Sequence, residues 1–155
     1  MSSPSTVSTA FQDPGEPVDG ELLLTVGQLY PGDAELGWVP AYRIFINVRG
    51  KNVGEIELRL GASDFIRQYA GQVAYGVDPP YRGNRFAARA LRLLPPLARR
   101  HGFTCIWATV DPENWASRRS CELAGATLVE IVELPEDCEM YREGYRQRCR
   151  YRLPC

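Results

Sequence analysis

The sequence predicts an α/β or α+β fold, in which helices pack on a central sheet. Strand-like apolar runs fill the first half of the chain, and in the second half two segments of helical periodicity alternate with further strand-like runs. With 155 residues, of which 45% are hydrophobic, the chain is long enough to bury one sizeable core. We therefore expect a single domain that spans residues 21–155.

The first 20 residues differ in composition from the rest of the chain. They are rich in Ser, Thr, Pro and Gly and contain few large apolar residues. Such a segment buries too little apolar surface to offset the entropy that is lost on ordering. Residues 1–20 are therefore predicted to form a flexible tail.

Strands are predicted at residues 22–29, 42–48 and 53–60. The last two are joined by a short turn that contains glycine and asparagine, which predicts a β-hairpin. Side chains alternate between the two faces of a strand. Glu55 and Glu57 are therefore expected on one face of the hairpin, opposite to the apolar residues of the same strand.

Helical periodicity is clear in residues 86–100 and 114–124. The first segment carries a stripe of alanine and leucine that is interrupted by Pro95 and Pro96. Because proline lacks a backbone donor, this helix is expected to kink there or to restart as a second segment. The second helix is closed by Gly125. Further strands are predicted at residues 72–77, 103–110, 126–134 and 148–153.

Charge and cysteine content exclude several classes of protein. The formal net charge is −1, so the chain has no global positive field for nucleic acid or an anionic membrane. No apolar run is long enough for a transmembrane helix, and the amino terminus lacks the pattern of a signal peptide. The five cysteines lack paired C-x-x-C spacing, which argues against a zinc site. We expect a cytoplasmic protein with no metal, nucleic-acid or membrane partner.

A basic loop connects the strand at residues 72–77 to the helix that begins near Phe86. The amide groups at a helix start, together with the side chains of Arg82 and Arg85, favour an anion such as phosphate. A solvated strand-to-helix turn is an equally good interpretation of this stretch alone. The chain lacks a Walker loop and a G-x-G-x-x-G fingerprint, which argues against a nucleoside triphosphate or a dinucleotide.

Two linked motifs resemble the GNAT superfamily of N-acetyltransferases. Residues 82–87 read Arg-Gly-Asn-Arg-Phe-Ala and resemble its acetyl-CoA loop, Arg/Gln-x-x-Gly-x-Gly/Ala, with Arg85 at the usual glycine. The side chain of Arg85 would either crowd or clasp a pyrophosphate. The segment Asn114-x-x-Ser117-x-x-x-Cys121 resembles the next helix motif of the superfamily. An apolar residue in place of tyrosine at Cys121 makes the chain most similar to the RimJ/RimL-like branch.

The resemblance implies a mixed, mainly antiparallel central sheet with helices packed on it, in which acetyl-CoA lies between two splayed middle strands. Two amino-terminal helices of that fold are expected to be reduced or absent, because residues 30–40 are too short and turn-rich to form them. The pantetheine arm would pair with the backbone of residues 75–77, and the pyrophosphate would rest on the amides of residues 83–87. Asn114 and Ser117 would contact the arm, although Asn114 is also a natural helix N-cap. The implied cofactor-binding residues are Tyr75, Gly76, Val77, Arg82, Gly83, Asn84, Arg85, Phe86, Ala87, Asn114 and Ser117.

The resemblance also implies direct attack of a primary amine on the thioester in a ternary complex. A protonated alkylamine needs a base, for which Glu57 and Glu55 are candidates, although either could be a solvent-facing strand residue. The backbone N–H of Val77 is a candidate for the developing oxyanion. Cys121 replaces the tyrosine that reprotonates the thiolate, which leaves Ser117 or water as the acid. The catalytic candidates are therefore Glu57, Glu55 and Ser117.

Other functions remain open at this point. A CoA-binding regulatory or interaction module without catalysis would also fit the two departures from the motifs. A nucleic-acid-binding stripe is disfavoured, because the net charge is close to neutral and no aromatic residues interleave with the basic ones. That stripe would consist of Arg82, Arg85, Arg89 and Arg92.

The acceptor implied by the resemblance is a small amine or a peptide or protein amine. Residues 30–40, 63–71 and 135–144 are expected to line its pocket. Acidic residues near the last segment hint at a cationic acceptor, although charged loops are commonly just solvated. A homodimer is also compatible with the sequence.

Overall fold

The computed structural model describes residues 7–155 and contains an eight-stranded sheet with the strand order β1-β2-β3-β4-β5-β6-β8-β7. The strands are β1 (Val18–Asp19), β2 (Leu22–Tyr30), β3 (Ala41–Val48), β4 (Lys51–Arg59), β5 (Val73–Val77), β6 (Cys105–Val110), β7 (Thr127–Glu133) and β8 (Gln147–Pro154). The helices are α1 (Phe86–Arg92), α2 (Pro95–Arg100), α3 (Trp115–Leu123) and α4 (Glu139–Arg142). Two single-turn elements are η1 (Ile66–Ala70) and η2 (Pro79–Tyr81).

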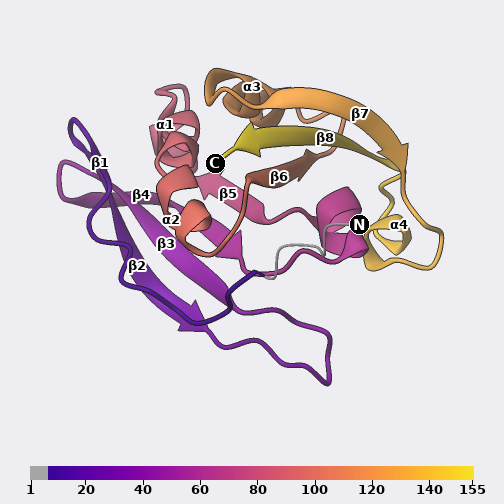
Figure 1. Ribbon diagram of the computed structural model, residues 1–155. Coiled ribbons are helices and arrows are strands. Elements are labelled where there is room, and N and C mark those ends of the chain that lie inside the picture. Colours follow the sequence, from indigo (N-terminus) through magenta and orange to yellow (C-terminus); the bar gives the residue numbers. More distant parts are fainter. Residues whose placement is uncertain (1–6) are drawn as a thin grey trace.

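The strands pair antiparallel throughout the sheet except for β5 and β6, which are parallel. This mixed, mainly antiparallel sheet confirms the predicted fold class. In Figure 1, the purple strands β2–β4 lie on one side of the molecule, and the orange and yellow strands β7 and β8 lie on the other. At the centre, β5 and β6 share one ladder pair, Val73 with Ala108, and then diverge. The predicted splay of the middle strands is therefore present.

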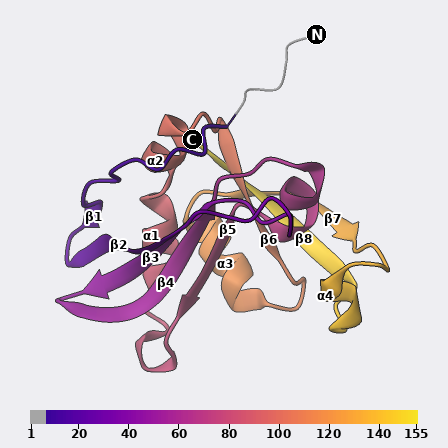
Figure 2. The ribbon, with the colours of Figure 1, turned by 90° about the horizontal axis from the view of Figure 1, so that it is seen from below.

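Helices α1, α2 and α3 pack on one face of the sheet (Figure 2). Leu58 and Ala108 turn towards this face and are buried in the core. On the opposite face, Thr109 donates to a backbone oxygen of η1 at 2.6 Å, and Arg150 donates to another. Among residues 7–155, no helix is both long and apolar enough to span a membrane.

Several local predictions agree with the structure. The helix predicted at residues 86–100 restarts at the prolines, with α1 ending at Arg92 and α2 beginning at Pro95. Glu55 and Glu57 are half-exposed, whereas the apolar residues that alternate with them in β4 are buried. Residues 31–40 form a loop without a helix.

The segment predicted as a flexible tail contacts the folded core where the structure describes it. His101 is fully buried, and its Nδ1 donates to the backbone oxygen of Ser8 at 2.7 Å. The Tyr42 hydroxyl lies 2.7 Å from Nε2 of the same imidazole, and Phe11 packs edge-on against Tyr42. Composition alone missed this, because a few specific contacts, rather than a long apolar run, hold the segment. The part of the predicted tail before residue 7 lies outside the described residues.

Gln72 joins β5 to β6 at the point where the two strands part. This residue is 1% exposed. Its backbone N–H donates to the oxygen of Trp107 at 2.9 Å, and its side-chain Oε1 accepts from the nitrogen of Trp107 at 2.7 Å. Its Nε2 donates to the oxygen of Gly61 at 3.1 Å. One buried side chain thus satisfies backbone groups of two other segments.

The substitution Gln72→Leu is expected to lower the free energy of unfolding by about 2–4 kcal/mol, because it leaves the N–H of Trp107 and the oxygen of Gly61 without these partners. Urea denaturation measures the change. Gln68→Leu, at a half-buried position of η1, serves as the control and should change stability by less than about 0.5 kcal/mol. Equal unfolding midpoints for Gln72→Leu and the wild type would contradict this role.

Candidate functional site

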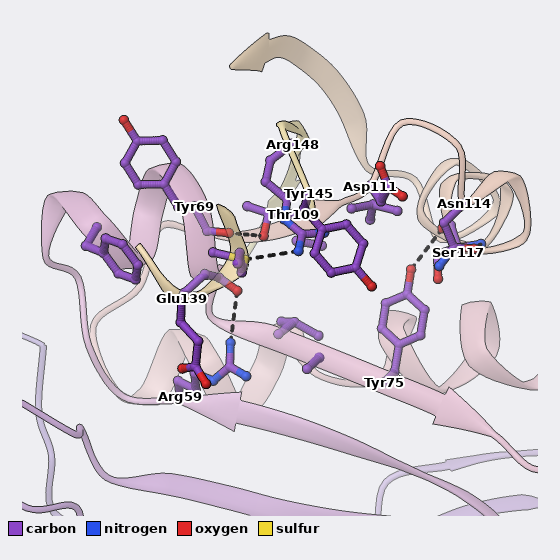
Figure 3. Close-up of a pocket in the computed structure, with 17 residues that line it drawn as sticks. Arg59, Tyr69, Tyr75, Thr109, Asp111, Asn114, Ser117, Glu139, Tyr145 and Arg148 are labelled. Carbon is purple, nitrogen blue, oxygen red and sulfur yellow. Dashed lines mark hydrogen bonds between the residues drawn. The ribbon is translucent and has the colours of Figure 1, made fainter. Parts of the chain in front are cut away.

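A cavity of about 500 Å³ opens where β5 and β6 diverge (Figure 3). Its walls contain residues from both faces of the sheet. Thr109 and Arg148 belong to the face that carries η1, and Tyr75 and Ser117 belong to the face that carries α3. The cavity therefore passes between the two strands instead of lying on one face.

Two of the three loops that were expected to line an acceptor pocket contribute to this cavity. Phe65 and Tyr69 come from residues 63–71, and Glu139 and Met140 come from residues 135–144. The loop at residues 30–40 does not contribute, because it follows β2, which is separated from the splay by β3, β4 and β5.

Alternate backbone groups of β5 face the splay. The oxygen of Gln72 and the nitrogen of Asp78 both form hydrogen bonds on the β4 side. Because the bonding direction alternates along a strand, the N–H and C=O groups of Tyr75 and Val77 point away from β4 and towards the splay. Gly76 lies between them and has open space where a side chain would be. Beyond the pair at Val73, this edge of β5 has no strand partner among the described residues.

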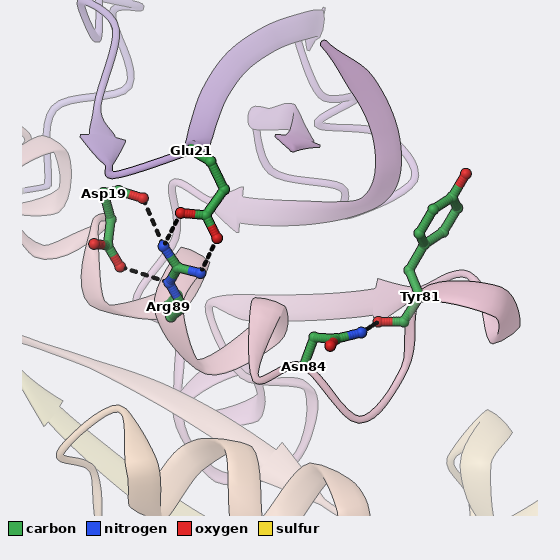
Figure 4. A network of polar contacts seen from close by, with 5 residues as sticks. All are labelled: Asp19, Glu21, Tyr81, Asn84 and Arg89. Carbon is green, nitrogen blue, oxygen red and sulfur yellow. Dashed lines mark hydrogen bonds and ion pairs between the residues drawn. The ribbon is translucent and has the colours of Figure 1, made fainter. Parts of the chain in front are cut away.

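The predicted anion loop is exposed at the start of α1. Arg85 adopts a left-handed backbone conformation with φ 63, which explains why glycine is usual at this position of the resembled motif. Its side chain is exposed and forms no ion pair among residues 7–155. Arg82 turns back and donates to the oxygen of Val77 at 2.8 Å. Asn84 donates to the oxygen of Tyr81 at 3.0 Å (Figure 4).

The remaining predicted loop residues, Gly83, Phe86 and Ala87, shape the backbone of the turn and begin α1. Gly83 has φ 87, and a side-chain carbon added to it would meet no other atom within 4 Å. Phe86 and Ala87 form the first turn of α1, which is seven residues long. A helix this short contributes little dipole, so the positive potential of the loop comes mainly from its arginines.

Asn114, Ser117 and Tyr75 meet at one end of the cavity. Asn114 caps α3, because its Oδ1 accepts from the nitrogen of Ser117 at 3.2 Å. The hydroxyl of Tyr75 reaches across from β5 and donates to the oxygen of Ser117 at 2.9 Å (Figure 3). The same hydroxyl lies 3.0 Å from Sγ of Cys121. The sequence indicated only the backbone of Tyr75, and its side chain is the feature that the structure adds.

Burial and the neighbouring Cys121 raise the pKa of Tyr75 well above its usual range, so its hydroxyl keeps its proton at neutral pH. Burial likewise raises the pKa of the Cys121 thiol to about 11. Cys121 is therefore a neutral thiol at physiological pH, which disfavours it as a nucleophile.

Neither glutamate that was predicted as a base lines this cavity. Both carboxylate oxygens of Glu55 accept hydrogen bonds from Arg43, and this guanidinium lowers the pKa of Glu55. A lowered pKa makes the carboxylate a weaker proton acceptor. Glu57 lies 3.7 Å from Nε of Arg59, which is itself a cavity residue. The geometry disfavours Glu55, and the role of Glu57 stays a prediction.

The cavity also holds two charged residues that the sequence did not single out for this site, beside Glu139 from the segment predicted to line the pocket. Asp111 follows β6, Glu139 begins α4 and Arg148 lies on β8. No local signal marks Asp111 and Arg148, because they come together only through the positions of β6 and β8 beside the splay. Within residues 7–155, no three His, Cys, Asp or Glu side chains lie close enough together to hold a metal ion.

The sequence model of the acetyltransferase (GNAT) family matches residues 13–125. The chain belongs to this family. The matched range contains both motifs that carried the resemblance, the anion loop and the segment from Asn114 to Cys121. A search of curated protein sequences gave no match.

Several solved acetyltransferases share the fold. The ribosomal α-N-protein acetyltransferase RimL is 16% identical with a TM-score of 0.62, and the match covers 89% of this chain and 96% of that chain. Mycobacterium smegmatis RimJ, solved with CoA-disulfide, is 20% identical with a TM-score of 0.58, covering 74% of this chain and 53% of that one. The microcin self-immunity acetyltransferase MccE, solved with acetyl-CoA and AMP, is 15% identical with a TM-score of 0.58, covering 74% and 61%. The chain therefore spans less than two thirds of RimJ and MccE.

Arg89 ties the helix after the anion loop to the beginning of the sheet (Figure 4). Its guanidinium lies 2.8 Å from Oδ2 of Asp19 and 2.9 Å from Oε1 of Glu21. Hydrogen bonding to Arg89 lowers the pKa of Glu21 from 4.5 to about 2. These pairs also neutralise Arg89, which breaks the arginine stripe that was considered for nucleic acid.

The substitution Arg89→Met is expected to destabilise the protein at neutral pH, and this difference from the wild type should shrink at low pH. Glu21 has a lowered pKa in the folded state, so its pairing stabilises the fold above about pH 4.5 and is lost as the pH falls towards about 2. Urea denaturation over this pH range measures the effect. Arg92→Met, at an exposed position of the same helix, is the control and should follow the wild type. A difference that stays constant with pH would contradict the role of Glu21.

Proposed function

We propose that the protein is an acetyl-CoA-dependent N-acetyltransferase that acts on a primary amine in a ternary complex. The observation that carries this proposal is the cavity that passes between β5 and β6, with the anion loop following the end of β5. A thioester held along the edge of β5 can then be reached by an amine from the opposite face of the sheet. Membership of the acetyltransferase (GNAT) family supports the same reaction.

The residues along β5 and its following loop fit acetyl-CoA. The N–H and C=O groups of Tyr75 that face the splay would bind the pantetheine arm as an added strand. Open space at Gly76 lets the arm approach closely. Arg85, whose side chain forms no ion pair within residues 7–155, would clasp the pyrophosphate together with the amides of the loop. The capping role of Asn114 leaves its amide nitrogen free for the arm.

The reaction forms an N–C bond to the acetyl carbon and breaks its C–S bond. Asp111, a half-buried carboxylate in the cavity wall, would take the proton of the ammonium group directly or through water. The N–H of Val77 faces the splay and would stabilise the developing oxyanion. The cavity itself holds the amine in line with the thioester, which lowers the entropic part of the barrier.

Tyr75 would give a proton to the departing thiolate, and the second proton of the attacking nitrogen, released as the amide forms, would restore the phenol through water. The Tyr75 hydroxyl lies 3.0 Å from Sγ of Cys121, the residue that stands where the resembled motif has tyrosine. The phenol of Tyr75, on β5, therefore lies beside the position on α3 where the resembled motif has a tyrosine. In this assignment Ser117 is not the acid, because its backbone oxygen positions the phenol. The raised pKa keeps Tyr75 protonated at neutral pH, and it also makes the phenol a weaker acid than an exposed tyrosine.

Calorimetric titration with CoA and thiol release from acetyl-CoA test the proposed function. The expected result is saturable CoA binding together with thiol release that depends on an added amine. The panel of amines added in the assay should include small alkylamines, amino acids and peptides with a free amino terminus. Absence of CoA binding would overturn the proposal. CoA binding without release for every amine would favour a catalytically inactive CoA-binding module.

The substitution Arg85→Gly tests the anion loop without disturbing its backbone, because glycine readily adopts φ 63. CoA affinity is expected to fall about 5-fold to 10-fold through loss of one charge-assisted contact. The loss should shrink at high salt. Stability should stay equal or rise by up to about 1 kcal/mol, since the strain of the left-handed conformation is relieved. Tighter CoA binding by this variant would show that Arg85 crowds the pyrophosphate.

The substitution Tyr75→Phe is expected to reduce kcat by about 10-fold to 100-fold near neutral pH, with CoA affinity within about twofold of the wild type. The reduction should become smaller above about pH 8.5, where a thiolate can leave without a proton. Tyr141→Phe, outside the cavity on α4, is the matched control. A larger loss for Ser117→Ala than for Tyr75→Phe would instead assign the proton to Ser117.

A further inference from the structure

Arg148 is a guanidinium in the cavity wall that lacks a strong protein partner. Its Nε is buried without a hydrogen-bond partner, and it is the one such side-chain atom among residues 7–155. One terminal nitrogen lies 3.0 Å from Sδ of Met140, and a thioether is a weak acceptor. No carboxylate of the described residues forms an ion pair with Arg148. Arg148 is half-buried in the cavity wall and its charge is not paired within the described residues, so its terminal nitrogens can bind an anion in the cavity.

The neighbouring arginines are already occupied. Arg59 also lines the cavity, but its Nη1 donates to the backbone oxygens of Ala70 and Gly71. Arg150 pairs with Glu130 at 2.5 Å and also donates to a backbone oxygen of η1. Free donor capacity on this side of the cavity is therefore concentrated at Arg148.

The position of Arg148 suits the far end of an acceptor. Its guanidinium carbon lies 4.8 Å from the centre of the Tyr145 ring, a stacking contact that restrains the donor plane. Arg148 is three residues before Tyr151, which pairs with Ala108 at the point where β5 and β6 part. A strand rise of about 3.3 Å and a strand spacing of about 4.8 Å place the Cα of Arg148 roughly 11 Å from that point. An arginine side chain and a short acceptor span such a distance together.

We propose that the amine acceptor carries a carboxylate and that Arg148 binds this group. The acceptor class is then an amino acid or a related aminocarboxylate. This inference rests on the proposed acetyl transfer and specifies its second substrate. The amine end would lie towards the splay near Asp111, and the carboxylate end would lie towards β8. A planar guanidinium offers two parallel donors to a carboxylate, which gives geometry as well as affinity.

Charges around the cavity agree with such a substrate. Asp111 and Glu139 are negative, and Arg148 is positive. The fourth charged group, Arg59, is held by backbone oxygens and lies 3.7 Å from Glu57. Carboxylates and a free guanidinium on the wall match the two opposite charges of a zwitterion. Selectivity follows because an acceptor without a carboxylate leaves Arg148 unpaired.

A series of ω-amino acids of increasing chain length, each compared with its carboxamide, tests this inference. Thiol release gives kcat/KM for each acceptor, and saturation-transfer NMR on the CoA-loaded protein gives binding without turnover. For at least one chain length, kcat/KM and binding affinity are both expected to be about tenfold or more higher for the carboxylate form than for its amide. Arg148→Gln should reduce that ratio to about twofold or less while CoA affinity is unchanged.

Arg152→Gln is the matched control, because Arg152 lies on the same strand, is exposed and does not line the cavity. It should keep the wild-type preference for the carboxylate form. Equal binding and use of carboxylates and amides by the wild type would overturn the inference, as would a preference that persists in Arg148→Gln. Failure of the proposed acetyl transfer can be told apart from failure of this inference. In the first case CoA does not bind, or no acceptor is turned over while carboxylate binding still depends on Arg148.

Discussion

One ladder pair, Val73 with Ala108, holds the two halves of the sheet together, and the buried amide of Gln72 reinforces it. Continuous antiparallel ladders run from β1 to β5 and from β6 through β8 to β7. Because the parallel neighbours β5 and β6 meet only at this vertex, the backbone edge of β5 is open beyond it. The cavity, the exposed amides of Tyr75 and Val77, and access from both faces all depend on this divergence.

Both departures from the resembled motifs have a structural explanation. The backbone at Arg85 is left-handed, which is why the resembled motif has glycine at this position. An exposed arginine tolerates that strain at the place where an anion is expected. Cys121 stands where the motif has tyrosine, and the phenol of Tyr75 fills the space beside its thiol. The first change adds a charge to the loop. The second moves a hydroxyl from a helix to the neighbouring strand.

The polar groups along the cavity between β5 and β6 differ in charge, and each is placed to meet a different charged group of the proposed substrates. In the proposed reaction, Arg85 in the loop would bind the pyrophosphate, Tyr75 would meet the thiolate, and Asp111 in the cavity wall would meet the ammonium group. Arg148, at the start of β8, would bind a carboxylate of the acceptor. The amino-terminal segment supports this arrangement from outside, because Arg89 anchors α1 to the residues around β1 and His101 binds the chain at Ser8.

Local signals in the sequence determined most of the strand and helix segments, the helix restart at Pro95, the cap at Asn114 and the basic loop before α1, because each depends on residues close together along the chain. The packing of residues 7–20, the pairing of Glu55 with Arg43 and the position of the Tyr75 hydroxyl were decided only by the tertiary structure. The same holds for the cavity charges: Asp111, Glu139 and Arg148 come from three separate segments. Only the divergence of β5 and β6, a contact between residues 35 positions apart at its vertex, brings them to one cavity.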